Sequence, residues 1–228
     1  MFRNLIAMSI ALSSVLVAVV SARDDSSVRR NVNNMQQVAF AMLVYHDMNK
    51  SLPPAVVERD GKPLLSWRVL LLPYLDDPKA KSLYDEFHLD EPWDSAHNRP
   101  LVAKMPDVYK SPNSKHTDGR TVYLTPRGEK TAFPGTRVVQ LRQVLDGTAK
   151  TLALLEVDDD RAVEWTKPDD WRFDPKNPTA GLGGQTTDGY TVAMLDSSIH
   201  YFPKSVDGKT LNKLLTMNGR ETVELPQW

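Results

Sequence analysis

The clearest apolar pattern in the chain is a single stripe along residues 26–50. Apolar residues recur there at steps of three and four, the spacing of one face of an α-helix. Leu52-Pro53-Pro54 follow, and residues that precede proline disfavour helix. The pattern therefore predicts a long helix that ends near residue 50 and is covered on one face by a sheet or another helix. The stripe consists of Val28, Val32, Met35, Val38, Met42 and Tyr45.

Two shorter helices are predicted next, at 64–75 and 77–89. The first is too short to cross a membrane and reads as a buried helix capped by Ser66. The second begins at Asp77-Pro78, a capping residue followed by proline at the first helical position. Both lie between the long helix and the second half of the chain, so they predict a helical insert.

From about residue 120 the pattern changes to short runs of branched or aromatic residues bounded by turn residues, which indicates strands. Asp196-Ser197 separates two of them as a hairpin turn would, and 207–219 reads as a final helix. Helices followed by strands indicate an α+β chain with a mostly antiparallel sheet. The predicted strands are 120–125, 151–157, 162–166, 190–196 and 198–202.

Residues 1–22 have the pattern of a targeting segment. Arg3 precedes the apolar run Leu5–Val20, and Val20-Ser21-Ala22 supply small residues before Arg23. This predicts a signal peptide followed by a single domain over 23–228; the alternative is a retained N-terminal anchor, with membrane contact only through residues 5–20. Either way the chain is expected to be exported, as a periplasmic or extracellular protein or one anchored in the inner membrane.

Composition narrows the classes of function. The net charge is −1, and no basic face indicates nucleic-acid binding. The chain has no cysteine, which excludes disulfides, thiolate metal sites and a cysteine nucleophile. Because no common catalytic motif is present, we expect a protein that is not an enzyme and that holds no cofactor and no metal.

Residues 88–101 concentrate two His, three carboxylates, a Trp and an Arg. They read as a structural loop, in which Trp93 anchors the chain on the core, or as a surface for a ligand or partner that includes Asp94 and His97. A metal or acid–base site at His88 and His97 is the third interpretation. Trp165 and Trp171 lie in a polar region of the sequence, and they either pack in the core and its loops, which we favour, or add two further candidates for such a surface.

Several multi-residue blocks resemble the planctomycete DUF1559 family, in the same order and over nearly all of the chain after the targeting segment. The resemblance implies a pilin-like architecture, with a long N-terminal helix packed on an antiparallel sheet. The blocks are "NNMQQVAFAMLVYHDMNKSLPPA" (33–55), "DGKPLLSWRVLLLPYLD" (60–76), "LYDEFHLDEPWDSAHNRPL" (83–101), "MPDVYKSP" (105–112), "LDGTAKTLALLEV" (145–157) and "VEWTKPDD" (163–170).

The resemblance also implies a function. Such proteins are similar to type II secretion pseudopilins, which predicts a non-enzymatic envelope protein with a structural or binding role, associated with secretion or transport. Its partners would be other envelope proteins or further copies of the chain. The alternative is a periplasmic module that binds a solute or a glycan in a concave site lined by Trp93, Trp165 or Trp171, and the remote alternative is a hydrolase that uses His88 and His97.

The chain departs from the family pattern at three places. The apolar run at 5–20 lacks the Glu of a prepilin segment. Asn31 and Ser111 stand where many members have Cys, which implies a lost disulfide. In the C-terminal motif, Thr186 stands in place of a His, and Asp196-Ser197 stand in place of Asp-Gly.

Overall fold

The computed structural model describes the backbone of residues 3–226 and the side chains of residues 26–226. The long helix α1 (Arg3–Asn49) ends at the predicted position. The expected targeting segment lies outside the residues whose side chains are described, so its cleavage stays a prediction. Among the residues whose side chains are described, no helix is both long and apolar enough to cross a membrane.

The sheet that follows is antiparallel and four-stranded, in the order β4-β5-β7-β8. Two separate strand pairs, β1-β2 and β3-β6, lie beside it. The strands are β1 (Val56–Arg59), β2 (Lys62–Ser66), β3 (Arg120–Thr121), β4 (Tyr123–Leu124), β5 (Leu152–Glu156), β6 (Val163–Glu164), β7 (Gly189–Met194) and β8 (Ile199–Pro203). The remaining helices are α2 (Trp67–Leu70), α3 (Pro78–Tyr84) and α4 (Gly208–Leu215).

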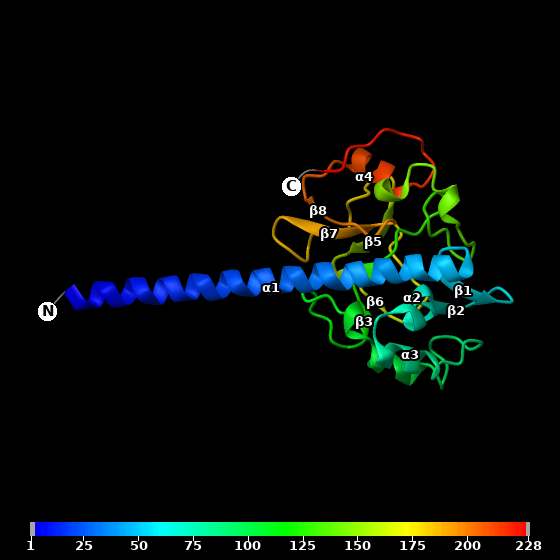
Figure 1. The fold of residues 1–228 in the computed structure, drawn as a ribbon, viewed down its shortest axis with the longest axis horizontal. Coiled ribbons are helices and arrows are strands. Elements are labelled where there is room, and N and C mark those ends of the chain that lie inside the picture. Colours follow the sequence, from blue (N-terminus) through cyan, green and yellow to red (C-terminus); the bar gives the residue numbers. More distant parts are fainter. Residues whose placement is uncertain (1–2, 227–228) are drawn as a thin grey trace.

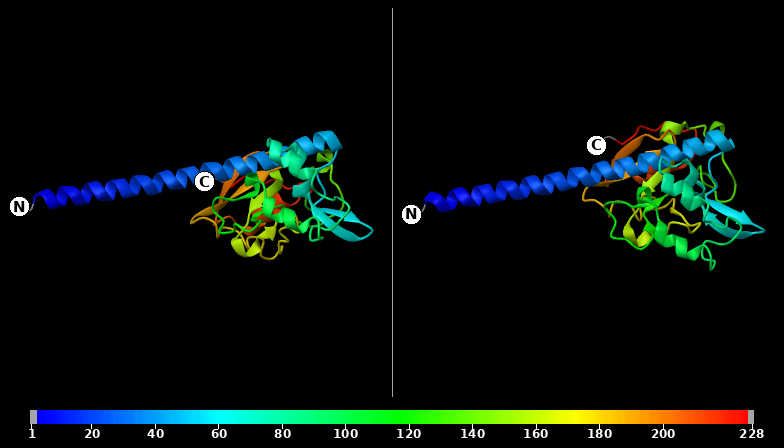
Figure 2. Two further views of the ribbon diagram at one scale, coloured as in Figure 1. Left: turned by 90° about the horizontal axis from the view of Figure 1, so that it is seen from below. Right: turned by 60° about the horizontal axis from the view of Figure 1, so that its bottom comes forward.

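The second half of α1 packs on β5, β7 and β8 of this sheet. In Figure 1 the sheet and α4 lie above α1, while α3 lies below it. The predicted stripe is confirmed where the helix meets the sheet, because Met35, Val38 and Met42 are fully buried. Val28 was expected in the same stripe but is exposed. In the left view of Figure 2 most of the remaining chain lies below α1, while a short segment of the insert reaches across it.

The insert between α1 and the sheet is less helical than predicted. The segment 64–75 was expected to be one helix, but its first three residues complete β2, and α2 covers only Trp67–Leu70. The side chain of Ser66 accepts a hydrogen bond from the backbone N–H of Arg68, so the predicted cap is present. The side chain of Asp77 caps α3 in the same way. The fold class is confirmed: a long helix on an antiparallel sheet, with an insert between them.

The hairpin turn predicted at Asp196-Ser197 joins β7 to β8. One oxygen of the Asp196 carboxylate accepts hydrogen bonds from the backbone N–H and the hydroxyl of Ser198, which holds the turn closed. Ser197 has a φ of 66°, in the left-handed region that a Cβ disfavours. The family pattern has Gly at this position, and the backbone explains why.

We expect Ser197→Gly to stabilise the protein by up to about 1 kcal/mol, because glycine relieves the left-handed strain at some cost in unfolded-chain entropy. Thermal unfolding of the two proteins measures the difference. Gly61→Ser, at a φ of 75° and with open space around its Cα, is the reverse change and should destabilise by a similar amount. A loss of stability in Ser197→Gly would contradict this account of the turn.

Candidate functional site

The polar stretch 88–101 is a loop held together by Asn98. The side-chain amide of Asn98 donates hydrogen bonds to the carbonyls of His88, Glu91 and Pro92, and its oxygen accepts one from the backbone N–H of His88. The side chain of Asn98 is fully buried, so these bonds replace water that the loop has lost. The backbone N–H of Trp93 donates to the carbonyl of Leu64, which fixes the loop to β2.

His88 and His97 stack on each other at the surface of this loop. Their ring centroids are 3.4 Å apart and the rings are parallel within 2°. His88 Nδ1 lies 2.9 Å from the carboxylate of Glu91, and that hydrogen bond lowers the pKa of Glu91. Parallel stacked rings direct their nitrogen atoms side by side and not toward a common point. Within residues 26–226 no group of three or more acidic, His or Cys side chains is placed to hold a metal ion.

The three candidate tryptophans lie in different surroundings. Trp165 is fully buried, where its ring stacks on Tyr109 and its Nε1 donates to the carbonyl of Val102. Trp171 is also buried. Trp93 is half-buried under the guanidinium of Arg99, 5.0 Å from the ring centroid. Trp165 and Trp171 are therefore not available to stack on a ligand at the surface. The other three candidates, Trp93, Asp94 and His97, lie together on one loop.

An ion pair between Arg68 and Asp170 is buried beneath the insert. Both side chains are fully buried, and Arg68 Nη2 lies 2.7 Å from Asp170 Oδ1. The same carboxylate accepts hydrogen bonds from the Trp67 indole and from the backbone N–H of Thr125. Burial raises the pKa of Asp170, while the charge of Arg68 and these donors act in the opposite direction. The pair joins α2 to the loop before Trp171.

A second buried carboxylate, Glu156, lies where α1 crosses the sheet. It accepts hydrogen bonds from the Asn31 amide at 2.7 Å, the Ser111 hydroxyl at 2.5 Å and the Asn113 amide at 3.0 Å. Asn31 also donates to the hydroxyl of Thr191 on β7, at 2.8 Å. Burial raises the pKa of Glu156. These bonds join α1, two strands and the loop at 111–113.

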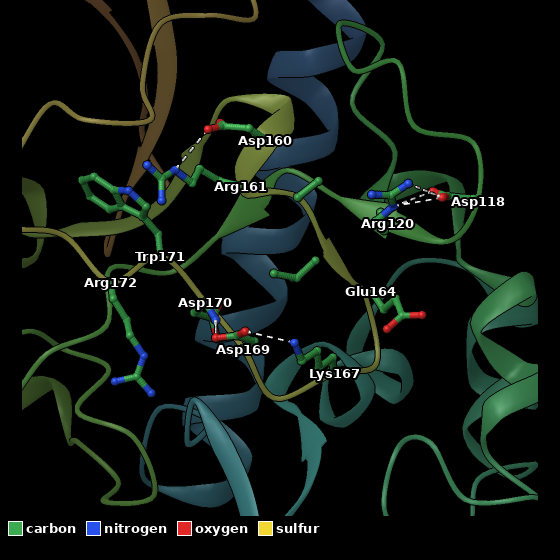
Figure 3. A pocket seen from close by; sticks show the side chains of 12 residues that line it. Asp118, Arg120, Asp160, Arg161, Glu164, Lys167, Asp169, Asp170, Trp171 and Arg172 are labelled. Atoms are coloured by element: carbon green, nitrogen blue, oxygen red, sulfur yellow. Dashed lines mark hydrogen bonds and ion pairs between the residues drawn. The ribbon is translucent and has the colours of Figure 1, made fainter.

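A charged pocket of about 620 Å³ opens beside the Arg68–Asp170 ion pair. Figure 3 shows that positive and negative side chains alternate around it. Lys167 pairs with Asp169, Arg161 with Asp160 and Arg120 with Asp118, so the pocket presents no region of one sign. The lining therefore favours neither an anionic nor a cationic ligand, and we interpret the pocket as a solvated charged surface.

A more apolar groove of about 590 Å³ runs along the outer face of α1. Its helical wall includes Phe40 and Val44, and its other wall is the segment Pro73–Leu75. Phe40 is 59% exposed, and Met48, one turn beyond Val44, is 70% exposed. Large apolar side chains this open on a helix are typical of a surface that another molecule covers.

Taken together, the long helix, the antiparallel sheet and the open outer face of α1 define a pilin-like α+β domain. Residues 29–132 match the family described as "Protein of unknown function (DUF1559)", whose short name is SBP_bac_10. Over these residues the chain is similar to the DUF1559 family. Searches of curated proteins and of solved structures found no match.

Sequence reasoning missed Arg68, Asp170 and Glu156 as the organising polar groups. A signal was present for two of them, Arg68 and Glu156. Arg68 is a lone charge in the apolar run 64–75, and Glu156 is a lone charge in the strand 151–157. A charge in an otherwise apolar element is buried only with a partner, so each predicts one elsewhere in the chain. The identity of that partner depends on contacts between residues 43 to 125 positions apart in the sequence, and the periodicity of the sequence does not encode such contacts.

Proposed function

We propose that this chain is an exported, non-enzymatic, pseudopilin-like protein of the cell envelope, in which the outer face of α1 joins the domain to further copies of itself. The observation that carries the proposal is the division of α1 into two faces. Val38 and Met42 are buried against the sheet, whereas Phe40 and Met48 point away from it and stay exposed. A helix used only as a support for the sheet needs no large apolar side chains on that outer face.

The polar groups of the described domain support a scaffold role. The carboxylates of Asp170 and Glu156 are enclosed by donors that join separate elements, so they are committed to holding the fold. The export part of the proposal rests on the sequence of residues 1–22, and N-terminal sequencing of the protein from the envelope tests it. A chain that begins at Arg23 and is soluble would remove the version with a retained anchor.

Self-association is tested with a photo-reactive phenylalanine analogue at Phe40. Because the analogue keeps the aromatic ring, we expect it to give, on irradiation of the purified chain, a covalent adduct of twice the mass of the chain. The matched control carries the analogue at Leu145, an apolar residue of similar exposure (53%) outside α1. An adduct formed equally well from both positions, or from neither, would contradict the proposed face.

A charged substitution on the same face gives an independent measurement. We expect Phe40→Asp to lower the association of the chain, measured by sedimentation, at least tenfold, because the carboxylate would have to be buried in the contact. Leu145→Asp should leave the association unchanged. Both side chains are exposed in the single domain, so neither change should affect folding.

A further inference from the structure

A pocket lies where the start of the described part of α1 meets the β7–β8 hairpin. It has a volume of about 650 Å³, within the range of sites that bind small molecules. One wall comes from α1, with Val28 and Val32, and the opposite wall comes from β8, with Ile199 and Tyr201. The loop at 185–188 forms its rim. This pocket is separate from the outer-face groove, and the inference drawn from it does not rest on the proposed self-association.

The floor of this pocket is rigid because it belongs to the Glu156 network. Thr191 and Asn113 line the pocket, and both are held from behind. Thr191 accepts a hydrogen bond from Asn31, and Asn113 donates one to Glu156. Polar groups that are fixed before a ligand arrives lose little freedom on binding, which favours affinity.

The rim offers hydrogen-bonding groups that the fold does not use. Within residues 26–226, the carboxylate of Asp188 and the hydroxyl of Thr187 make no hydrogen bond or ion pair. Thr186, at the position where the family pattern has a His, is in contrast occupied, since its hydroxyl interacts with the carbonyl of Gly189 and with the hydroxyl of Tyr201. The unused acceptors and hydroxyl therefore lie together on one side of the opening.

The lining selects against anions. Among the residues 26–226 that line the pocket there is no Lys or Arg, Asp188 is the one acidic side chain, and His200 is the one basic side chain. A phosphate or carboxylate ligand would find neither a lysine nor an arginine among these residues, only the His200 imidazole, and would be repelled by the Asp188 carboxylate. The pocket instead combines hydroxyl, amide, imidazole and carboxylate groups with the apolar surfaces of Val32, Ile199 and the Tyr201 ring.

From this combination we infer that the pocket binds a neutral, polyhydroxylated small molecule, such as a mono- or disaccharide. Adjacent hydroxyls of a sugar donate to one carboxylate, which is the role of Asp188. Thr187 and Asn113 supply further hydrogen bonds, and the apolar C–H face of the sugar packs on Ile199 and Tyr201. The ring that contacts the sugar is thus a tyrosine of β8, and none of the tryptophans expected from sequence.

Calorimetric titration of the full-length chain with D-glucose, N-acetylglucosamine and maltose tests the inference. We expect at least one of these sugars to bind with about millimolar affinity or better, and choline and inorganic phosphate not to bind. Asp188→Asn should weaken binding about tenfold, since it removes the charge from the hydrogen bonds to the sugar. Thr187→Val should weaken it by a smaller factor.

Asp94→Asn is the matched control, because Asp94 is also an exposed acid but lies on the 88–101 loop. It should leave sugar affinity unchanged, and both Asn variants should unfold at the same temperature as the parent. Three results would overturn the inference: no binding of any of the three sugars, binding of choline in their place, or an affinity that Asp188→Asn does not change. None of these results bears on the cross-linking expected at Phe40.

Discussion

Asp170→Asn is expected to destabilise the protein by about 3–5 kcal/mol, because the change leaves the buried guanidinium of Arg68 without its counter-charge. Arg68 is fully buried, and its other hydrogen bonds go to the neutral Tyr123 carbonyl, the Ser66 hydroxyl and a more distant carbonyl at Asp169. None of these neutralises the charge. Urea denaturation of the parent and the variant measures the loss.

The neighbouring residue provides a control of the same chemistry. Asp169 pairs with Lys167 at 3.3 Å, and both side chains are more than a third exposed. Since exposed ion pairs contribute little, Asp169→Asn should cost no more than about 1 kcal/mol. If the two substitutions cost the same, the Arg68–Asp170 pair is not the organising contact of the insert.

Replacing both members of the pair separates the cost of an unpaired charge from the value of the pair. We expect Arg68→Met combined with Asp170→Leu to be less destabilised than Asp170→Asn alone, because no charge then remains buried. The residual loss would come from the hydrogen bonds of the Trp67 indole and the Thr125 N–H, which lose their acceptor.

The sequence predicts those parts of the fold that depend on local patterns of residues. The α1 stripe through Met35 and Met42 was predictable because its helical period extends over several turns, and the turn at Asp196-Ser197 because its residues are typical of turns. The strand end at Leu64–Ser66 was not predictable, since a short run of apolar residues has the same appearance in a helix and in a buried strand. Pairing with β1 decides between them, and that pairing is a tertiary contact.

The candidate site was less predictable than the fold. The polar neighbours of Trp165 in the sequence left ligand binding open beside core packing, and the ring packs against Phe87 and Tyr109, residues far away in the chain. Exposure of an isolated aromatic residue depends on what the rest of the chain brings to it. Tyr201, which lines the proposed sugar pocket, lay in a predicted strand and had no local feature to mark it.

The contacts of Glu156 show what stands in this chain at the two positions where the family resemblance implies a lost disulfide. Asn31 and Ser111, which stand where many family members have Cys, both donate hydrogen bonds to this one carboxylate. The link that a disulfide would give between α1 and the 111–113 loop is made here through a buried acid. The structure therefore holds the two positions together by hydrogen bonds in a chain that has no cysteine.

Glu156→Ala is accordingly expected to cost about 3–5 kcal/mol, because it leaves several buried donors without an acceptor and opens a cavity under α1. Glu164→Ala is the control. Glu164 is also in a strand but is partly exposed and pairs with Arg99 at the surface, so its loss should cost less than about 1 kcal/mol. Urea denaturation at neutral pH compares the two.

The pH dependence of stability tests how burial changes the ionisation of the same carboxylate, Glu156. Burial raises the pKa of Glu156 above its ordinary value of 4.5, so the folded protein binds this proton more tightly than the unfolded chain does. The contribution of Glu156 to the free energy of unfolding is then fully present below about pH 4.5 and is lost as the pH rises through the pKa of the folded protein. The loss is at most about 1.4 kcal/mol per pH unit. Glu156→Gln removes the titration, so the difference in unfolding free energy, parent minus variant, should decrease from pH 4 to pH 7. A difference that increases over this range would mean that the donors around the carboxylate outweigh its burial.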